Sequence, residues 1–134
     1  MPRKILVYGH GDKSAAGFSS AAALKTYIGG GVFQSEDGRY RYSQKKRAEI
    51  IILCREGFAF GHFEVDGIES PTAADLEAYP PVKGVYQVRK STQYSDPVRM
   101  TDLDIAQYQY GKYITEEEFD GILRRAGKTE VFCR

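Results

Sequence analysis

The chain has 134 residues, of which 42% are hydrophobic and 28% are charged, and its formal net charge is +1. These values are typical of a globular protein and exclude a disordered chain. The length fits one domain, residues 1–134, with a core of about 32–134 that follows a strand, a loop and a helix in 1–31. The near-neutral charge excludes a uniformly basic nucleic-acid-binding protein, and two cysteines are too few for a disulfide framework. Because no signal-peptide pattern opens the sequence, we expect a cytoplasmic protein.

The loop after the first expected strand carries residues suited to an anion. Residues 3–8 (RKILVY) predict a buried strand, and the sequence GHGDKS follows it. The loop could present backbone N–H groups to an anion; its residues are Gly9, His10, Gly11, Lys13 and Ser14. The spacing matches neither a Walker A loop nor G-x-G-x-x-G, so an ordinary turn is the alternative. A helix capped by Ser19 or Ser20 is expected next, and Gly29 ends it.

Residues 39–47 (RYRYSQKKR) form the most basic part of the chain, with five positive charges and no negative one. Arginines alternate there with Tyr40 and Tyr42 after an Asp-Gly turn signal, which indicates extended backbone. A near-neutral total can therefore hide a positive face, and the local field is what attracts a polyanion. Solvated charges spread around a sheet are the alternative.

Residues 50–68 (IIILCREGFAFGHFEVDGI) are the most hydrophobic part of the sequence. The apolar run ends at Cys54, far short of the roughly 20 residues that cross a membrane, so we expect two strands joined by a tight turn. In a regular second strand, neither face would be cleanly apolar. A bulge at Gly61 would reverse the faces midway and turn the apolar side chains inward, namely Phe58, Phe60, Phe63 and Val65.

The segment after this hairpin predicts a short helix and then a long strand. Ser70 and Pro71 begin a helical insert, because proline is favoured at the first helical position. Residues 82–103 predict a strand, a turn at residues 95–97 and a short return.

The last helix has the clearest signals. Thr115 and Glu118 form a capping box, and Gly127 ends the helix before a strand at 129–133. With it, the sequence predicts about six strands and three short helices. Because the strands follow one another through the middle of the chain, this order favours an α+β fold over a βαβ fold.

Residues that could carry catalysis are few. His62 beside Glu64 on one strand could act as an acid/base pair, although a strand histidine bonded to a neighbour is the more ordinary arrangement. Two histidines and two cysteines, scattered singly, predict neither a metal site nor a cofactor. A small hydrolase or nucleotide-processing enzyme that uses His10 and His62 stays open as an alternative, and it requires the two histidines to share one cleft.

Two stretches resemble the core of a PUA-like domain. They are the strand pair AEIIILC and FAFGHFEVDGI, and the stretch GVYQVRKSTQYSDPVRMTDL, within residues 48–103. Inside that superfamily they are most similar to EVE and ASCH modules, and ITEEEFDGILRRAG resembles the helices that close such modules. The resemblance implies a small mixed, mostly antiparallel β-barrel whose cleft holds a flipped or unpaired base between aromatic rings.

Binding chemistry is better supplied than catalytic chemistry. Ten tyrosines and seven phenylalanines stand among the cations, and flat rings beside guanidinium groups are what base stacking and phosphate contact require. We therefore expect a nucleic-acid-binding module, rather than an enzyme, that recognises a modified or flipped base. An interaction or dimerisation module built on exposed tyrosines is a second alternative. The expected contact residues are Arg39, Tyr40, Arg41, Tyr42, Lys45, Lys46, Arg47, Phe60, His62, Tyr86, Arg89 and Lys90.

Overall fold

The computed structural model describes six stretches of the chain: 3–9, 39–42, 46–55, 57–78, 82–108 and 111–133. The helix expected near Ser19 lies outside these residues, as do five residues that the sequence singled out: His10, Gly11, Lys13, Ser14 and Lys45. No helix in the described stretches is long and apolar enough to cross a membrane.

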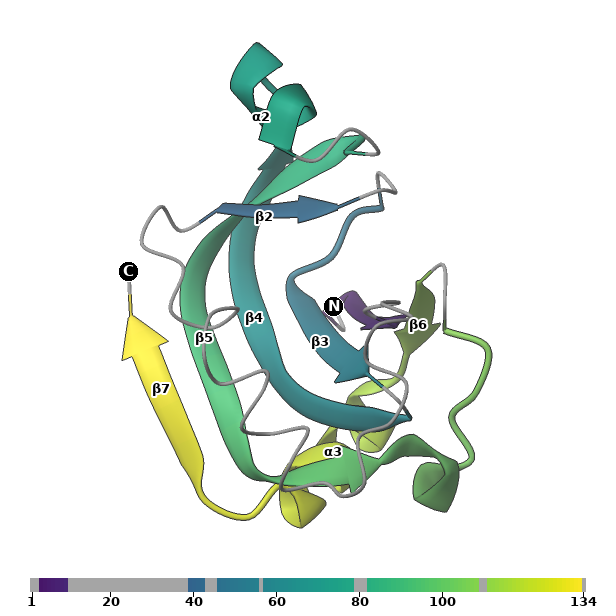
Figure 1. The fold of residues 1–134 in the computed structure, drawn as a ribbon. Coiled ribbons are helices and arrows are strands. Elements are labelled where there is room, and N and C mark those ends of the chain that lie inside the picture. The colour runs from purple at the N-terminus through teal and green to yellow at the C-terminus, as the bar shows by residue number, and fades with distance from the viewer. Residues whose placement is uncertain are drawn as a thin grey trace.

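The described residues form seven strands in one sheet, two α-helices and one short 3-10 helix (Figure 1). In chain order they are β1 (Ile5–Gly9), β2 (Arg39–Tyr42), β3 (Ile50–Arg55), β4 (Phe58–Glu69), α2 (Ala73–Ala78), β5 (Gly84–Arg99), η2 (Met100–Leu103), β6 (Lys112–Ile114), α3 (Glu116–Arg125) and β7 (Thr129–Cys133). Two α-helices are fewer than the three expected, since the third expectation falls on residues that the structure does not describe.

The sheet is mixed and open, so the expected closed barrel is wrong. Its strand order is β2-β5-β4-β3-β1-β6, and β7 also pairs with β5. Only the β1–β3 pair is parallel among these ladders. Both β2 and β7 lie along one edge of β5, and the three-residue β6 forms the other edge of the sheet. No backbone ladder of the described strands joins these two edges, although β4 and β5 bend strongly across the molecule (Figure 1).

The strand β5 is longer than the sequence predicted. Residues 95–97 do not turn, and the strand runs on to Arg99. The backbone N–H groups of Ser95 and Asp96 donate to the carbonyl oxygens of Lys128 and Ala126, at 2.7 and 3.0 Å. The connection between α3 and β7 therefore satisfies the irregular part of the strand, which local turn chemistry could not show.

The central strand β3 is apolar on both faces because each face covers a separate core. Ile50, Ile52 and Cys54 belong to a cluster that also contains Phe119 of α3, here called the Phe119 cluster. Ile51 and Leu53 belong to the second cluster. That second group, the Phe60 cluster, consists of Leu6, Ile51, Leu53, Phe60, Phe63, Val65, Tyr86 and Val88. The continuous apolar run of the sequence is thus a strand buried on both sides.

The bulge expected in β4 is present, next to Gly61. Leu53 pairs with Gly61 while Cys54 pairs with Ala59, so Phe60 is the extra residue. The reversal places Phe60, Phe63 and Val65 in one cluster, with Phe58 packed against it. It also sends His62 to the other face of the sheet.

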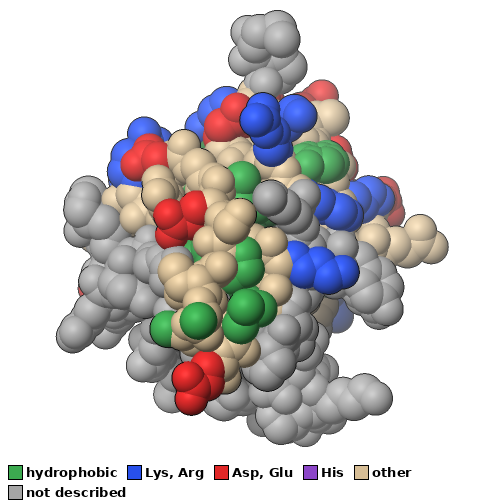
Figure 2. All heavy atoms as spheres, turned by 90° about the horizontal axis from the view of Figure 1, so that it is seen from above, with side chains coloured by type: hydrophobic (Ala, Val, Ile, Leu, Met, Phe, Trp, Pro, Cys, Tyr) green, Lys and Arg blue, Asp and Glu red, His purple; other side chains and the backbone are tan. Residues whose placement is uncertain are grey.

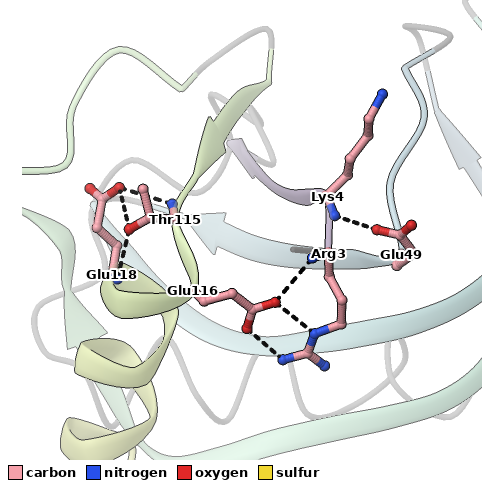
Figure 3. A network of polar contacts seen from close by, with 6 residues as sticks. All are labelled: Arg3, Lys4, Glu49, Thr115, Glu116 and Glu118. Atoms are coloured by element: carbon pink, nitrogen blue, oxygen red, sulfur yellow. Dashed lines mark hydrogen bonds and ion pairs between the residues drawn. The ribbon is translucent and has the colours of Figure 1, made fainter. Parts of the chain in front are cut away.

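Helix α3 is tied to the start of the chain by a network of polar contacts (Figure 3). The side chains of Thr115 and Glu118 form the expected capping box. The guanidinium group of Arg3 donates to both carboxylate oxygens of Glu116, at 2.9 and 2.8 Å. The backbone N–H of Lys4 donates to the carboxylate of Glu49. These contacts fix the entry to β1 against the entry to β3 and the first turn of α3.

Candidate functional site

Two consecutive residues of the basic stretch, Lys46 and Arg47, lie where the chain enters β3, and they are called the basic segment below. The Tyr86 hydroxyl donates to the carbonyl oxygen of Lys46. The Tyr113 hydroxyl donates to the carbonyl oxygen of Arg47 at 2.7 Å. The Lys46 ammonium group donates to the carbonyl oxygen of Gly111 at 3.1 Å. Backbone and side chain of the basic segment are therefore both held by neighbouring elements.

The two tyrosines lie on the same side of the sheet. Tyr113 pairs with Leu6, and Leu6 and Tyr86 belong to the Phe60 cluster. Directly paired residues of a sheet share a face, so Tyr113 projects from the face that this cluster covers. The Tyr86 side chain is fully buried, whereas Tyr113 is 48% exposed. Burial raises the pKa of Tyr86 to about 12 and also raises the pKa of Tyr113, so both hydroxyls keep the proton that they donate.

The arginines of the described residues differ in whether a carboxylate already neutralises them. Arg89 lies 3.4 Å from Glu64 and 3.5 Å from Asp66, and Lys90 lies 3.6 Å from Glu64. Arg47 is exposed, and no carboxylate of the described stretches forms an ion pair with it. Figure 2 shows acidic side chains standing among the Lys and Arg side chains on the face seen from above. Local pairing therefore decides which cations can meet an anion.

The structure brings together some of the expected contact residues and separates others. Lys46, Arg47 and Tyr86 meet, and Phe60 belongs to the same core cluster as Tyr86, with 2% of its surface exposed. Strand β2 pairs with β5 so that Tyr40 stands opposite Tyr86. For the four residues of β2 the structure describes the backbone but no side-chain contacts; they are Arg39, Tyr40, Arg41 and Tyr42. Gly9 ends β1 opposite Cys54, away from the basic segment.

His62 lies apart from the basic segment. Its Nδ1 and the Tyr94 hydroxyl share a hydrogen bond of 2.8 Å, and its ring stands edge-on to Phe119 at 5.2 Å between centroids. Only 6% of the residue is exposed. Burial lowers its pKa to about 4, against a smaller opposite effect of Glu64. His62 is therefore a neutral core residue at pH 7 that joins the sheet to α3.

Two features of the site were not among the expected contact residues. Tyr113 lies on β6, a strand that the sequence did not predict, and Gly111 precedes it with a φ of 90°. This left-handed conformation favours glycine, so Gly111 could have marked a turn into a short strand.

Among the described residues, no three His, Cys, Asp or Glu side chains gather closely enough to hold a metal ion. Cys54 is buried, which raises the pKa of its thiol.

Comparison with known proteins identifies a fold and no closer relationship. No protein-family model matches the chain, and no curated protein does. A solved structure does match, that of a point mutant of the ZmASCH protein from Zymomonas mobilis, with a TM-score of 0.57 and 12% sequence identity. The match covers 92% of this chain and 98% of that chain. The chain therefore shares its fold with the ZmASCH protein.

Proposed function

We propose that this chain is a nucleic-acid-binding module that contacts the phosphates of an unpaired RNA strand through Lys46 and Arg47. The observation that carries the proposal is the exposed Arg47 guanidinium, which no described carboxylate neutralises, on a segment that two tyrosine hydroxyls hold in place. The fold shared with the ZmASCH protein also supports the proposal, because the modules that this sequence resembles are expected to bind nucleic acids.

The physical chemistry of the segment suits a phosphate backbone. Arginine presents a planar set of donors that matches phosphate oxygens, and a cation held in position loses less conformational entropy on binding than a free one. The exposed ring of Tyr113 lies beside it, and a base stacked on an aromatic ring contributes roughly 1–3 kcal/mol. Cation and ring together form the smallest unit that can bind one nucleotide of a single strand.

Recognition of a modified or flipped base, as in EVE-type readers, is the finer form of this proposal. It requires an aromatic ring that a base can reach. Of the four rings expected among the contact residues, Phe60 and Tyr86 are buried in the core. Tyr113 and the half-buried Phe58 are described rings that keep accessible surface. The base contact is accordingly assigned to the rim of the Phe60 cluster rather than to its centre.

Among the described residues the hydrolase has no observation in its favour, and the interaction module, expected on exposed tyrosines, has the exposed Tyr113. The hydrolase needs His62 in a cleft with His10, and His62 is enclosed by Tyr94 and Phe119. For the interaction module, Leu76 on α2 and Val131 on β7 are exposed, but these elements lie at different places on the molecule (Figure 1). Single exposed apolar side chains are ordinary in a globular protein.

Fluorescence anisotropy of a labelled oligonucleotide tests the proposal. The purified chain is titrated into unpaired RNA, unpaired DNA and duplexes, with and without a modified cytosine or adenine, across a range of salt concentrations. We expect tightest binding to unpaired RNA, weakened by salt. Arg47→Ala should weaken binding. It should also lower the slope of log affinity against log salt concentration by about one, the loss of one phosphate contact. Lys128→Ala, which removes an exposed cation after α3, is the matched control. Equal effects of the two variants, or salt-insensitive binding, would contradict the proposal.

A further inference from the structure

Besides Arg47, a second arginine is of interest. Arg99 lies over an aromatic ring, at the end of β3 opposite to the basic segment. Arg99 ends β5 and pairs directly with Phe58, the first residue of β4. The guanidinium carbon of Arg99 lies 5.3 Å from the centroid of the Phe58 ring, within the range of a cation–π contact. The backbone N–H of Met100 donates to the Gly57 carbonyl oxygen at 3.0 Å. The backbone therefore fixes the pair from both sides.

No carboxylate of the described residues neutralises the charge on this pair. Arg99 is exposed and Phe58 is half-buried. Asp102 and Asp104 are the nearest described acids after it in the sequence, and neither forms an ion pair with Arg99. Arg3, by comparison, also lies over an aromatic ring but is paired with Glu116. The Arg99 guanidinium carbon lies over the ring, and the exposed part of the group can meet a phosphate and a flat base.

The Phe58/Arg99 pair lies on the same face of the sheet as Tyr86, the tyrosine that holds Lys46. Phe58 packs against the Phe60 cluster, to which Tyr86 belongs. The basic segment comes before β3 in the chain, and Phe58 comes after the turn that follows β3. The six residues of β3 span about 20 Å at roughly 3.3 Å per residue. The two cationic sites are therefore separated by about the length of this strand.

We propose that the Phe58/Arg99 pair is a second contact for the same unpaired RNA strand, a stacking site for one nucleobase, and that the RNA reaches from Arg47 to Arg99. This inference rests on the proposed function. A strand of about 4 nucleotides or more, the lower limit for small β-modules, is needed to reach both sites. A dinucleotide, whose stacked bases are roughly 3.4 Å apart, reaches only one.

Binding of unpaired RNA of about 8 nucleotides, compared with a dinucleotide competitor, tests the inference. We expect Arg99→Ala to weaken binding of the longer strand about five- to tenfold, the loss of one stacked base, and to leave the dinucleotide at the basic segment unaffected. Phe58→Leu, which keeps apolar bulk and removes the ring, should cause a similar loss. Arg99→Lys keeps the charge and should retain the salt slope while losing most of the stacking.

The control is Arg124→Ala, which removes an exposed arginine from α3, and thermal unfolding checks that each variant is folded. If Arg99→Ala behaves like Arg124→Ala while Arg47→Ala still weakens binding, the second contact is wrong and the proposed function stands. If Arg47→Ala has no effect either, the proposed function itself fails. The same series with unpaired DNA distinguishes a requirement for the ribose 2′-hydroxyl from a contact made by base and phosphate alone.

Discussion

Tyr86 and Tyr113 hold two consecutive carbonyl groups, those of Lys46 and Arg47, through their hydroxyls. The first tyrosine lies on β5 and the second on β6, and three strands separate β5 from β6 in the ladder. They reach the same segment only because the sheet is rolled. Side chains thus bridge an open sheet that no backbone ladder of the described strands closes, and the bridge fixes the basic segment at the rim.

Replacing Tyr86 by Phe should reveal the strength of this bridge. The change leaves the Lys46 carbonyl without its donor in a partly buried place, and we expect the free energy of unfolding to fall by about 1–2 kcal/mol. Tyr113→Phe, at an exposed hydrogen bond, should cost roughly 0.5–1 kcal/mol. Urea denaturation measures both, and the double variant shows whether they are coupled. A Tyr86→Phe variant as stable as the parent chain would refute the bridge.

His62 should make the protein sensitive to acid. Its pKa is about 4 in the folded chain and about 6.5 in an unfolded one. Below pH 6.5 the unfolded state binds the proton more readily, so stability is lost as the pH falls from about 6.5 to 4, by up to roughly 3 kcal/mol. Glu64, Lys90 and Arg3 act on the same ring.

The measurement is the free energy of unfolding against pH for the parent chain and for His62→Gln. The carboxylates titrate in both, so their effect cancels in the difference. We expect the difference between the two curves to shrink as the pH falls through this window. A constant difference would show that His62 is not held neutral by the core.

Gly127 should tolerate substitution poorly. It has a φ of 69°, and a Cβ atom there would lie 2.3 Å from Asp96 Oδ2 and 2.4 Å from Ser95 Oγ. Those side-chain ends can move, but the left-handed backbone remains, so we expect Gly127→Ala to cost about 1–2 kcal/mol. Gly67→Ala is the matched control, because a Cβ at Gly67 meets nothing within 4 Å. Thermal unfolding compares the two, and equal melting temperatures would contradict the expectation.

Arg89 should matter less for nucleic-acid binding than Arg47, although the sequence listed both. Arg89 already lies against Glu64 and Asp66, and a phosphate would have to compete with these carboxylates. We expect Arg89→Ala to change the affinity for unpaired RNA less than twofold, because its charge is already paired. Arg47→Ala should lower the salt slope of binding by about one. Anisotropy titrations at several salt concentrations decide it. A larger effect at Arg89 would place the interface on β5.

The sequence predicted those parts of the fold that depend on neighbouring residues. The strand at residues 50–54, the reversal next to Gly61 and the capping box of Thr115 all follow from local patterns, and all are present. The run through residues 95–97 was predicted wrongly because its N–H partners come from Ala126 and Lys128. Local turn residues cannot reveal such a distant partner.

The site was only partly predictable for the same reason. The basic segment is visible as a run of charge, and Tyr86 could be listed as a ring. Nothing local shows that Tyr86 and Tyr113 share the segment, because that depends on the roll of the whole sheet. The neutralisation of Arg89 likewise depends on Glu64, which β4 places alongside it. Which cations are neutralised by a carboxylate is therefore decided by the pairing between strands, which the sequence alone does not show.

Amide NMR spectra of the chain, recorded as unpaired RNA of about 8 nucleotides is added, test most directly whether the rim of the rolled sheet binds nucleic acid. The largest shifts should fall on residues 46–48 and on Lys112 and Tyr113, with a second group at Phe58 and Arg99. Shifts confined to α3 and β7, or none at low salt, would show that the segment held by Tyr86 and Tyr113 is not a nucleic-acid contact.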